Sequence, residues 1–306
     1  MVVVLAGGSG GARLARGMLD VVGAQELAVV VNTGDDVEIY GVHVSPDPDL
    51  VTWWLADLID ERGWGIAGDS WEVMSALEAA GRPSWFRLGD RDLAMCLLRT
   101  ELLRAGERLT TAQAEVARAA GVEARVLPMS DDPVRTRLKL GGRWHPFQEF
   151  MISEGGRGGG EIEGVELDGV DDARPTPEVL DAIAAADAIV IGPSNPVISI
   201  GPILAVPGIR DAIATADAPV VAVSPFVSGR ALKGPTEDFC RYAGLPLGTA
   251  CAIEAYAGLV DGVVADEPTD RSVPVHLTDT LMDTDAARRR LAATTLEFAA
   301  TSRRGD

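Results

Sequence analysis

The sequence is poor in the residues on which disulfide scaffolds and zinc sites depend. It holds three cysteines in 306 residues, and no two of them form a C-x-x-C pair. Its three histidines are too few for a histidine-rich metal centre. We therefore expect reduced, mostly buried thiols and no structural zinc site.

Long apolar runs are absent as well. No stretch approaches the roughly 20 apolar residues that a membrane-spanning helix requires. The first residues contain neither a basic segment nor a small-residue cleavage site, so they do not resemble a secretory signal. We expect a cytoplasmic protein that does not insert into a membrane.

Basic residues, and lysine in particular, are scarce. The chain has 27 lysine and arginine residues against 46 acidic ones, for a formal net charge of −19, and its lysines are Lys139 and Lys233. Such a surface repels nucleic acids and anionic membranes, so we predict neither as a partner. The acidic excess indicates a salt-rich cytoplasm, because dissolved ions screen self-repulsion. High-GC codon usage explains the lysine deficit equally well, but it does not explain the aspartates.

Glycine and short β-branched runs are what the chain does have. Its 34 glycines, 47% hydrophobic residues and 5% aromatic residues suit a globular α/β protein. Short apolar runs alternate with helix-like segments, which predicts a Rossmann-like, doubly wound and mainly parallel sheet. The strands predicted for this sheet are residues 2–5, 27–31, 124–127, 188–191, 220–223 and 260–265.

The pattern predicts a single α/β domain over residues 1–306. Within it, residues 50–121 are predicted to form a mostly helical insertion. Residues 135–170 are predicted to form a small β region, with strands at 135–140 and 147–152 and a flexible glycine-rich loop after them.

Several helix ends carry capping signals. Thr176 before Pro177 is typical of an N-cap followed by a first helical residue. Thr110 and Gln113 have the spacing of a capping box. A last helix is expected over about 284–300.

The start of the chain carries the strongest functional signal. The apolar run 2–5 breaks into four glycines before a helix-like segment. Strand, glycine turn and helix together present backbone N–H groups and a helix amino end to an anion. A G-x-G-x-x-G fingerprint would need a glycine where Arg13 stands, and no Walker Gly-Lys-Ser/Thr follows. A tight turn without a ligand is the alternative. We predict an anion-binding turn, with the nucleotide type left open, at Gly7, Gly8, Ser9, Gly10 and Gly11.

Aspartates cluster after the second predicted strand and in the next loop. Asp35 and Asp36 follow that strand, at the edge where ligands bind in open parallel sheets. Asp47 and Asp49 lie in a rigid Ser-Pro-Asp-Pro-Asp loop. Paired carboxylates near a phosphate commonly hold Mg²⁺, although capping and turn roles are the alternative. We predict Mg²⁺ as cofactor, with Asp35, Asp36 and Asp47 as its ligands.

Two other polar turns are candidates for ligand contacts. Ser194 and Asn195 lie between prolines after a predicted strand, which suits a second phosphate or nucleoside contact and suits a structural turn equally well. Arg91, between Asp90 and Asp92 at a predicted helix start, suits a phosphate clamp, ring stacking or a surface ion pair.

Nine short motifs occur in order along the chain. They are the glycine-rich opening, Asn32-Thr-Gly-Asp-Asp36, Ser45-Pro-Asp-Pro-Asp49, Arg62-Gly-Trp-Gly65, Leu88-Gly-Asp-Arg-Asp92, Leu127-Pro-Met-Ser-Asp-Asp-Pro133, Phe147-Gln-Glu149, Gly192-Pro-Ser-Asn-Pro196 with Ser199-Ile-Gly201, and Asp279-Thr-Leu-Met282. Together they closely resemble the 2-phospho-L-lactate transferases of coenzyme F420 biosynthesis, also called FO transferases. The resemblance covers nearly the whole chain. Its departures are Pro146 and a glycine insertion near Gly155.

The resemblance implies a Mg²⁺-dependent transfer. A phospholactyl or phosphoenolpyruvyl group would move from a guanosine diphosphate-linked donor to the terminal ribityl hydroxyl of FO, the deazaflavin precursor, and GMP would leave. The glycine loop, Ser194 and Asn195 would hold the donor. Asp36 and Asp49 would orient or deprotonate the hydroxyl. The residues expected to bind FO are Asp49, Asp90 and Arg91.

Two other functions compete with the transferase. A regulatory nucleotide-sugar-binding protein of the gluconeogenesis-factor type is similar in fold and in its glycine-rich start. An NAD-dependent dehydrogenase would place Asp35 on a ribose, but the missing third glycine argues against it. The sequence leaves the lactyl or enolpyruvyl donor open, and we expect a homodimer because that is the commonest closed assembly.

Overall fold

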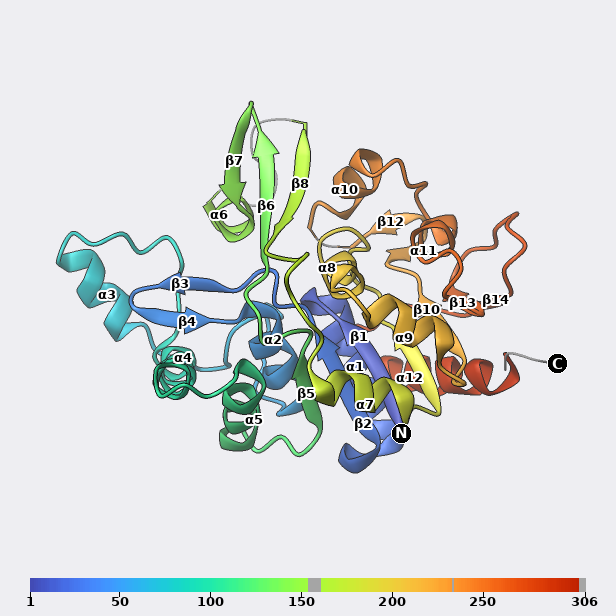
Figure 1. Cartoon of the computed structure of the whole chain (residues 1–306), viewed down its shortest axis with the longest axis horizontal. Helices are drawn as coiled ribbons and strands as arrows, with labels where there is room; N and C mark the ends of the chain where they lie inside the picture. The colour runs from blue at the N-terminus through green and yellow to red at the C-terminus, as the bar shows by residue number, and fades with distance from the viewer. Residues whose placement is uncertain (154–160, 233, 303–306) are drawn as a thin grey trace.

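The computed structural model describes residues 1–153, 161–232 and 234–302. Its centre is a seven-stranded sheet in the order β14-β13-β10-β9-β1-β2-β5, with every neighbouring pair parallel (Figure 1). The predicted α/β fold with a mainly parallel sheet is therefore confirmed. The strands are β1 (Val2–Ala6), β2 (Leu27–Val31), β5 (Arg125–Pro128), β9 (Ala188–Ile191), β10 (Val220–Val223), β13 (Gly262–Ala265) and β14 (Val275–Leu277).

Helices cover both faces of the sheet, and its central strands are accordingly continuous runs of valine, isoleucine, leucine and alanine. One face packs against α1 (Gly8–Val22), α2 (Pro46–Leu55) and α12 (Asp285–Thr301). The other face packs against four shorter helices. These are α7 (Pro177–Ala184), α8 (Ile200–Ala205), α9 (Ile209–Thr215) and α11 (Thr249–Ala255).

The strand order changes direction at β1. The chain first builds outward through β2 and β5, then returns to place β9 on the other side of β1 and builds outward again. The pairing of Leu5 with both Val30 and Ile191 keeps the carboxyl ends of β2, β1 and β9 level. The loops after β1 and β9 consequently leave the sheet toward opposite faces, which opens the crevice where ligands bind in such folds.

The remaining elements are insertions between sheet strands (Figure 1). Besides α2, a hairpin and three helices lie between β2 and β5. Besides α7, an antiparallel sheet ordered β7-β6-β8 and one described helix lie between β5 and β9. A two-stranded hairpin and a helix follow β10. The bounds are η1 (Ala24–Glu26), β3 (Val37–Ile39), β4 (Val42–Val44), α3 (Glu72–Ala79), α4 (Asp90–Arg104), α5 (Leu109–Ala119), β6 (Arg135–Leu140), β7 (Arg143–Pro146), α6 (Phe147–Ser153), β8 (Gly164–Asp168), β11 (Phe226–Val227), β12 (Arg230–Ala231) and α10 (Thr236–Tyr242).

Three local expectations fail for identifiable reasons. The strand expected over 147–152 is helix α6, because Phe147 and Phe150 share one helical face and pack on Leu138 and Phe239. The expected Ser-Pro-Asp-Pro-Asp loop is the start of α2, with proline at its first position.

The expected Thr110–Gln113 capping box is also wrong. Helix α5 begins at Leu109, and the amide and hydroxyl of Thr110 both donate to Asp131 Oδ1 at 2.7 Å. Gln113 is fully buried inside the fold. By contrast, Thr176 caps α7 as predicted, because its hydroxyl accepts from the Val179 amide at 3.2 Å.

Two further sequence expectations concern thiols and mobile segments. All three cysteines are buried and free of disulfides, as expected. Most of the predicted glycine-rich loop, residues 154–160, lies outside the described residues. Among the helices that the structure describes, none is long and apolar enough to cross a bilayer.

Candidate functional site

A cavity of about 390 Å³ opens at the carboxyl ends of β1, β9 and β10. Its walls come from the glycine loop after β1, the loops after β2, β9 and β10, the helix α6, and the segment after β14. The cavity thus lies at the reversal of strand order, and its volume is typical of a small-molecule site.

The glycine loop forms one wall of this cavity. Gly7, Gly8, Ser9 and Gly10 line it, whereas Gly11 does not. A Cβ on Gly10 would lie 2.0 Å from the carbonyl oxygen of Pro193, and a Cβ on Gly11 would lie 2.7 Å from Ser194 Oγ. These two glycines therefore let the loops after β1 and β9 pack directly on each other.

Only part of the glycine loop's backbone is available to a ligand. The amide of Gly8 donates to Asp47 Oδ1 at 2.7 Å, and the amide of Gly7 donates to Ser194 Oγ at 3.4 Å. The first N–H groups of a helix have no intrahelical acceptor, so those of Ser9 and Gly10, at the amino end of α1, remain available to a ligand.

The loop after β9 forms the opposing wall. Asn195 Oδ1 accepts from the amides of Val197 at 2.9 Å and Ile198 at 3.2 Å, which fixes the turn. Its Nδ2 is buried with no partner among the described residues, and Asn195 lines the cavity. Asn195 therefore fixes the turn through Oδ1 and still offers its Nδ2 as a hydrogen-bond donor.

Two buried carboxylates line the cavity near β2. Asp35 Oδ1 has no hydrogen-bond partner among the described residues, and Asp47 Oδ2 accepts from Asn32 Nδ2 at 3.0 Å. Burial, and next the charge of Asp47, raise the pKa of Asp35 well above its usual value. Burial raises the pKa of Asp47 to about 6, although the Gly8 amide and Asn32 act in the opposite direction. Two close carboxylates with an unsatisfied oxygen form a donor set that fits Mg²⁺.

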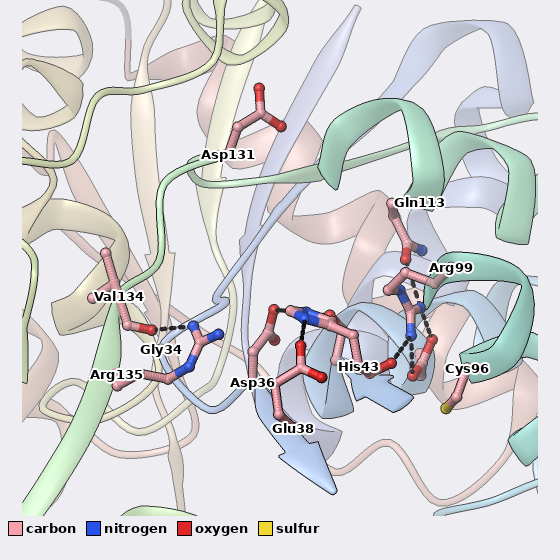
Figure 2. A network of polar contacts seen from close by, with 12 residues as sticks. Gly34, Asp36, Glu38, His43, Cys96, Arg99, Gln113, Asp131, Val134 and Arg135 are labelled. Carbon is pink, nitrogen blue, oxygen red and sulfur yellow. Dashed lines mark hydrogen bonds and ion pairs between the residues drawn. The ribbon is translucent and has the colours of Figure 1, made fainter. Parts of the chain in front are cut away.

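Asp36 lies outside the cavity lining and faces the β3–β4 hairpin. His43 Nε2 lies 2.9 Å from Asp36 Oδ2, and His43 Nδ1 lies 2.7 Å from Glu38 Oε1 (Figure 2). Ser45 Oγ donates to the same Asp36 oxygen at 2.8 Å. Burial lowers the pKa of His43, but the hydrogen bond and charge of Asp36, together with Glu38, outweigh it and leave the pKa raised.

Asp49 is held in a buried ion pair beside this network. Both of its carboxylate oxygens accept from Arg99, whose side chain is fully buried. Gln113 Oε1 accepts from Arg99 Nη2 at 2.9 Å, and Gln113 Nε2 donates to Thr52 Oγ1 at 2.9 Å. Asp49 is not among the residues that line the cavity.

Asp90 and Arg91 have local partners away from the cavity lining. The Asp90 carboxylate accepts from Ser70 Oγ at 2.7 Å and from the amides of Glu72 and Val73 at 3.0 and 3.1 Å, so it caps the start of α3. Arg91 is exposed and donates to the carbonyl oxygen of Ala67 at 3.1 Å. The structure therefore does not bring these two predicted FO contacts to the cavity.

Several cavity residues escaped the sequence-based prediction. Arg13 was noted only as a departure from a fingerprint, and Thr280 and Met282 only as part of a motif, yet all three line the cavity. So do Phe147 and Met151 of α6. The sequence signal that could have identified Phe147, Thr280 and Met282 is their place in the motifs at 147–149 and 279–282.

Comparison with known proteins decides the family. The model of the family described as 2-phospho-L-lactate transferase CofD matches residues 2–296. The chain belongs to this family. It is accordingly an enzyme, a 2-phospho-L-lactate or phosphoenolpyruvate transferase of coenzyme F420 biosynthesis.

The relatives span almost the full chain. A phosphoenolpyruvate transferase of Kitasatospora aureofaciens is 40% identical over 312 residues, which cover 95% of this chain and 97% of that relative. A 2-phospho-L-lactate transferase of Methanosarcina mazei is 36% identical over 266 residues, or 87% and 86% of the two chains. A crystal structure of an upf0052 family member from Bacillus halodurans has a TM-score of 0.63 at 19% identity, covering 96% of this chain and 98% of that one, and it supports the fold.

Proposed function

We propose that this family member transfers a phospholactyl or phosphoenolpyruvyl group from a guanosine diphosphate-linked donor to the ribityl hydroxyl of FO. The observation that carries the proposal is a single cavity in which a helix amino end meets two buried carboxylates. A diphosphate needs N–H donors, which the helix amino end supplies. A phosphoryl group under attack needs a divalent cation, which the two carboxylates are suited to hold.

The donor's diphosphate binds along the glycine loop. The amides of Ser9 and Gly10 donate to its oxygens, and the unpartnered Nδ2 of Asn195 donates from the opposing wall. The guanosine extends toward the loops after β10 and β14, where Ser224 and Thr280 offer hydroxyl groups.

Asp35 and Asp47 would hold Mg²⁺, and Asp36, which contacts His43, would support this loop. The bound ion would neutralise charge on the phosphoryl oxygens. The Gly8 amide keeps Asp47 oriented toward the cavity, which ties the carboxylate to the phosphate loop. Burial disfavours the ionised form of both carboxylates, and a cation placed between them would offset that cost by favouring the ionised form.

The acceptor hydroxyl attacks the phosphorus that carries the lactyl or enolpyruvyl group. A new O–P bond forms, the bond from that phosphorus to the bridging oxygen breaks, and its electron pair leaves with GMP. The hydroxyl proton passes to a cavity carboxylate and then to water. Phe147 and Met151 offer an apolar surface for the deazaflavin ring. Asp49 contributes by holding the start of α2 through Arg99, since both of its oxygens are already occupied.

The decisive experiment is incubation with FO, Mg²⁺ and each of the two guanosine-linked donors, followed by mass determination of the products. We expect one donor to yield GMP and the phosphodiester of FO, and chelation of Mg²⁺ to stop the reaction. Binding of GDP without conversion of FO by either donor would overturn the proposed reaction.

A further inference from the structure

Arg13 lies one helical turn after Ser9 and Gly10, which line the cavity and whose amides remain available to an anion. It lies in the second turn of α1, four residues after Ser9 and three after Gly10. Side chains on a helix lean toward its amino end and cover the preceding turn. Arg13 accordingly lines the same cavity as Ser9 and Gly10 of the preceding turn.

The guanidinium has no carboxylate partner of its own. Arg13 forms no ion pair among the described residues, and its Nε is buried without a hydrogen-bond partner there. Its contact is with the ring of Trp54, whose centroid lies 5.3 Å from Arg13 Cζ. Burial, and next the charge of Arg288, lower the pKa of Arg13. In a chain with a net charge of −19, a partly buried cation that lacks an anion indicates a site that an anionic ligand completes.

The charges in the cavity are separated. Among the described residues that line it, Arg13 is the sole cation, and the carboxylates are those of Asp35 and Asp47. No ion pair joins Arg13 to Asp35 or Asp47 among the described residues, and the charges that shift its pKa are those of Arg288, which lowers it, and Asp283, which raises it. Thr280, three residues before Asp283, also lines the cavity and has a buried Oγ1 without a partner among the described residues.

We propose that Arg13 binds the phosphate of the donor that stays with the guanosine. This inference rests on the proposed transfer reaction. The attacked phosphoryl group lies at the carboxylates and their cation, and the second phosphate lies at the amino end of α1 under Arg13. When the bond to the bridging oxygen breaks, its electron pair passes to this second phosphate. Arg13 holds the added negative charge, so it favours the transition state more than the bound donor.

The test compares Arg13→Met and Arg13→Lys with wild type in calorimetric titrations with guanosine, GMP and GDP. Arg16→Met is the matched control, because Arg16 lies on the same helix but pairs with Asp20 and Asp57 outside the cavity. Loss of a charge-assisted hydrogen bond should weaken GMP and GDP binding by about 10- to 100-fold in Arg13→Met. Guanosine affinity should stay unchanged, Arg13→Lys should recover part of the loss, and Arg16→Met should bind all three ligands as wild type does.

Steady-state kinetics supply the second readout. We expect kcat of Arg13→Met to fall more than the donor's KM rises, because the charge on the leaving phosphate grows during the reaction. Unchanged GMP and GDP affinities in a folded Arg13→Met variant would overturn the proposal. An increased donor KM with unchanged GMP affinity would also overturn it and would assign Arg13 to the donor's carboxylate. Failure of wild type to bind GDP or convert FO would instead count against the proposed function itself.

Discussion

The amide of Gly8 donates a 2.7 Å hydrogen bond to Asp47 Oδ1, across 39 residues of sequence. This bond joins the glycine loop after β1 to the carboxylate at the start of α2. It means that one of the glycine amides orients a candidate metal ligand, while the next two amides remain for an anion. A phosphate and a cation bound in this cavity would therefore be held by one connected structure.

Replacing Gly10 should affect folding and binding together. In Gly10→Ala the new Cβ would lie 2.0 Å from the Pro193 carbonyl oxygen, which forces the two loops apart. We expect a loss of about 1–3 kcal/mol in the free energy of unfolding and at least about tenfold weaker GDP binding by calorimetry. Gly41→Ala is the control: it has φ +77° but open space around its Cβ, so GDP affinity should not change. A Gly10→Ala variant that melts and binds like wild type would contradict this packing.

Replacing Asp35 with a neutral residue should raise the stability of the protein and lower its activity. Because burial and Asp47 disfavour its ionised form, Asp35→Asn should raise the melting temperature in Mg²⁺-free buffer at pH 8. The same change should reduce turnover by at least about 100-fold, because a metal ligand supplies several kcal/mol of charge stabilisation. GDP affinity should be less affected than turnover. Unaltered activity and unaltered Mg²⁺ dependence would assign Asp35 to turn formation alone.

Asp92 should make stability fall as pH rises. Burial, and next the charge of Asp49, raise its pKa to about 7, and its Oδ1 has no partner among the described residues. The folded state therefore binds more protons than the unfolded state between about pH 4 and pH 7, so the free energy of unfolding decreases across this window. Asp92→Asn should flatten that dependence and raise stability at pH 8 by roughly 1–3 kcal/mol. Denaturant titrations at several pH values measure both effects, and parallel curves for the two proteins would exclude them.

Removing one partner of the Arg99–Asp49 ion pair should lower the free energy of unfolding more than removing both partners. Arg99→Met leaves Asp49 buried without its cation, which should cost about 3–5 kcal/mol of unfolding free energy. Arg99→Met combined with Asp49→Leu should recover most of that stability, because no unpaired charge remains. Chemical denaturation of wild type, the single variant and the double variant checks this. Equal stabilities for the single and double variants would show that the pair contributes through packing alone.

Salt should stabilise the protein. A net charge of −19 produces self-repulsion that counter-ions screen, so the melting temperature should rise between low and molar KCl. Scanning calorimetry at several KCl concentrations across that range measures the melting temperature. A melting temperature independent of KCl would argue against adaptation to a salt-rich interior.

Much of the sheet could be read from local pattern. The runs at 27–31, 188–191 and 220–223 coincide with β2, β9 and β10, because buried parallel strands need continuous apolar residues between turns. The 147–152 segment failed because a short apolar run does not distinguish a strand from a helix, and contact with Phe239 decided for the helix.

The sequence by itself determined that this chain forms an α/β fold with a glycine turn after its first strand, and its ordered motifs were enough to indicate the family. Only the tertiary structure decided which of its clustered aspartates meet. Asp35 and Asp36 are adjacent, yet one lines the cavity and the other binds His43, because consecutive side chains leave the backbone in different directions. Arg13, which the sequence singled out only as a departure from a fingerprint, lines the cavity, whereas Asp49 pairs with Arg99 outside its lining. Whether a charge meets a buried partner or an open cavity depends on segments far away in the chain, such as Arg99 on α4.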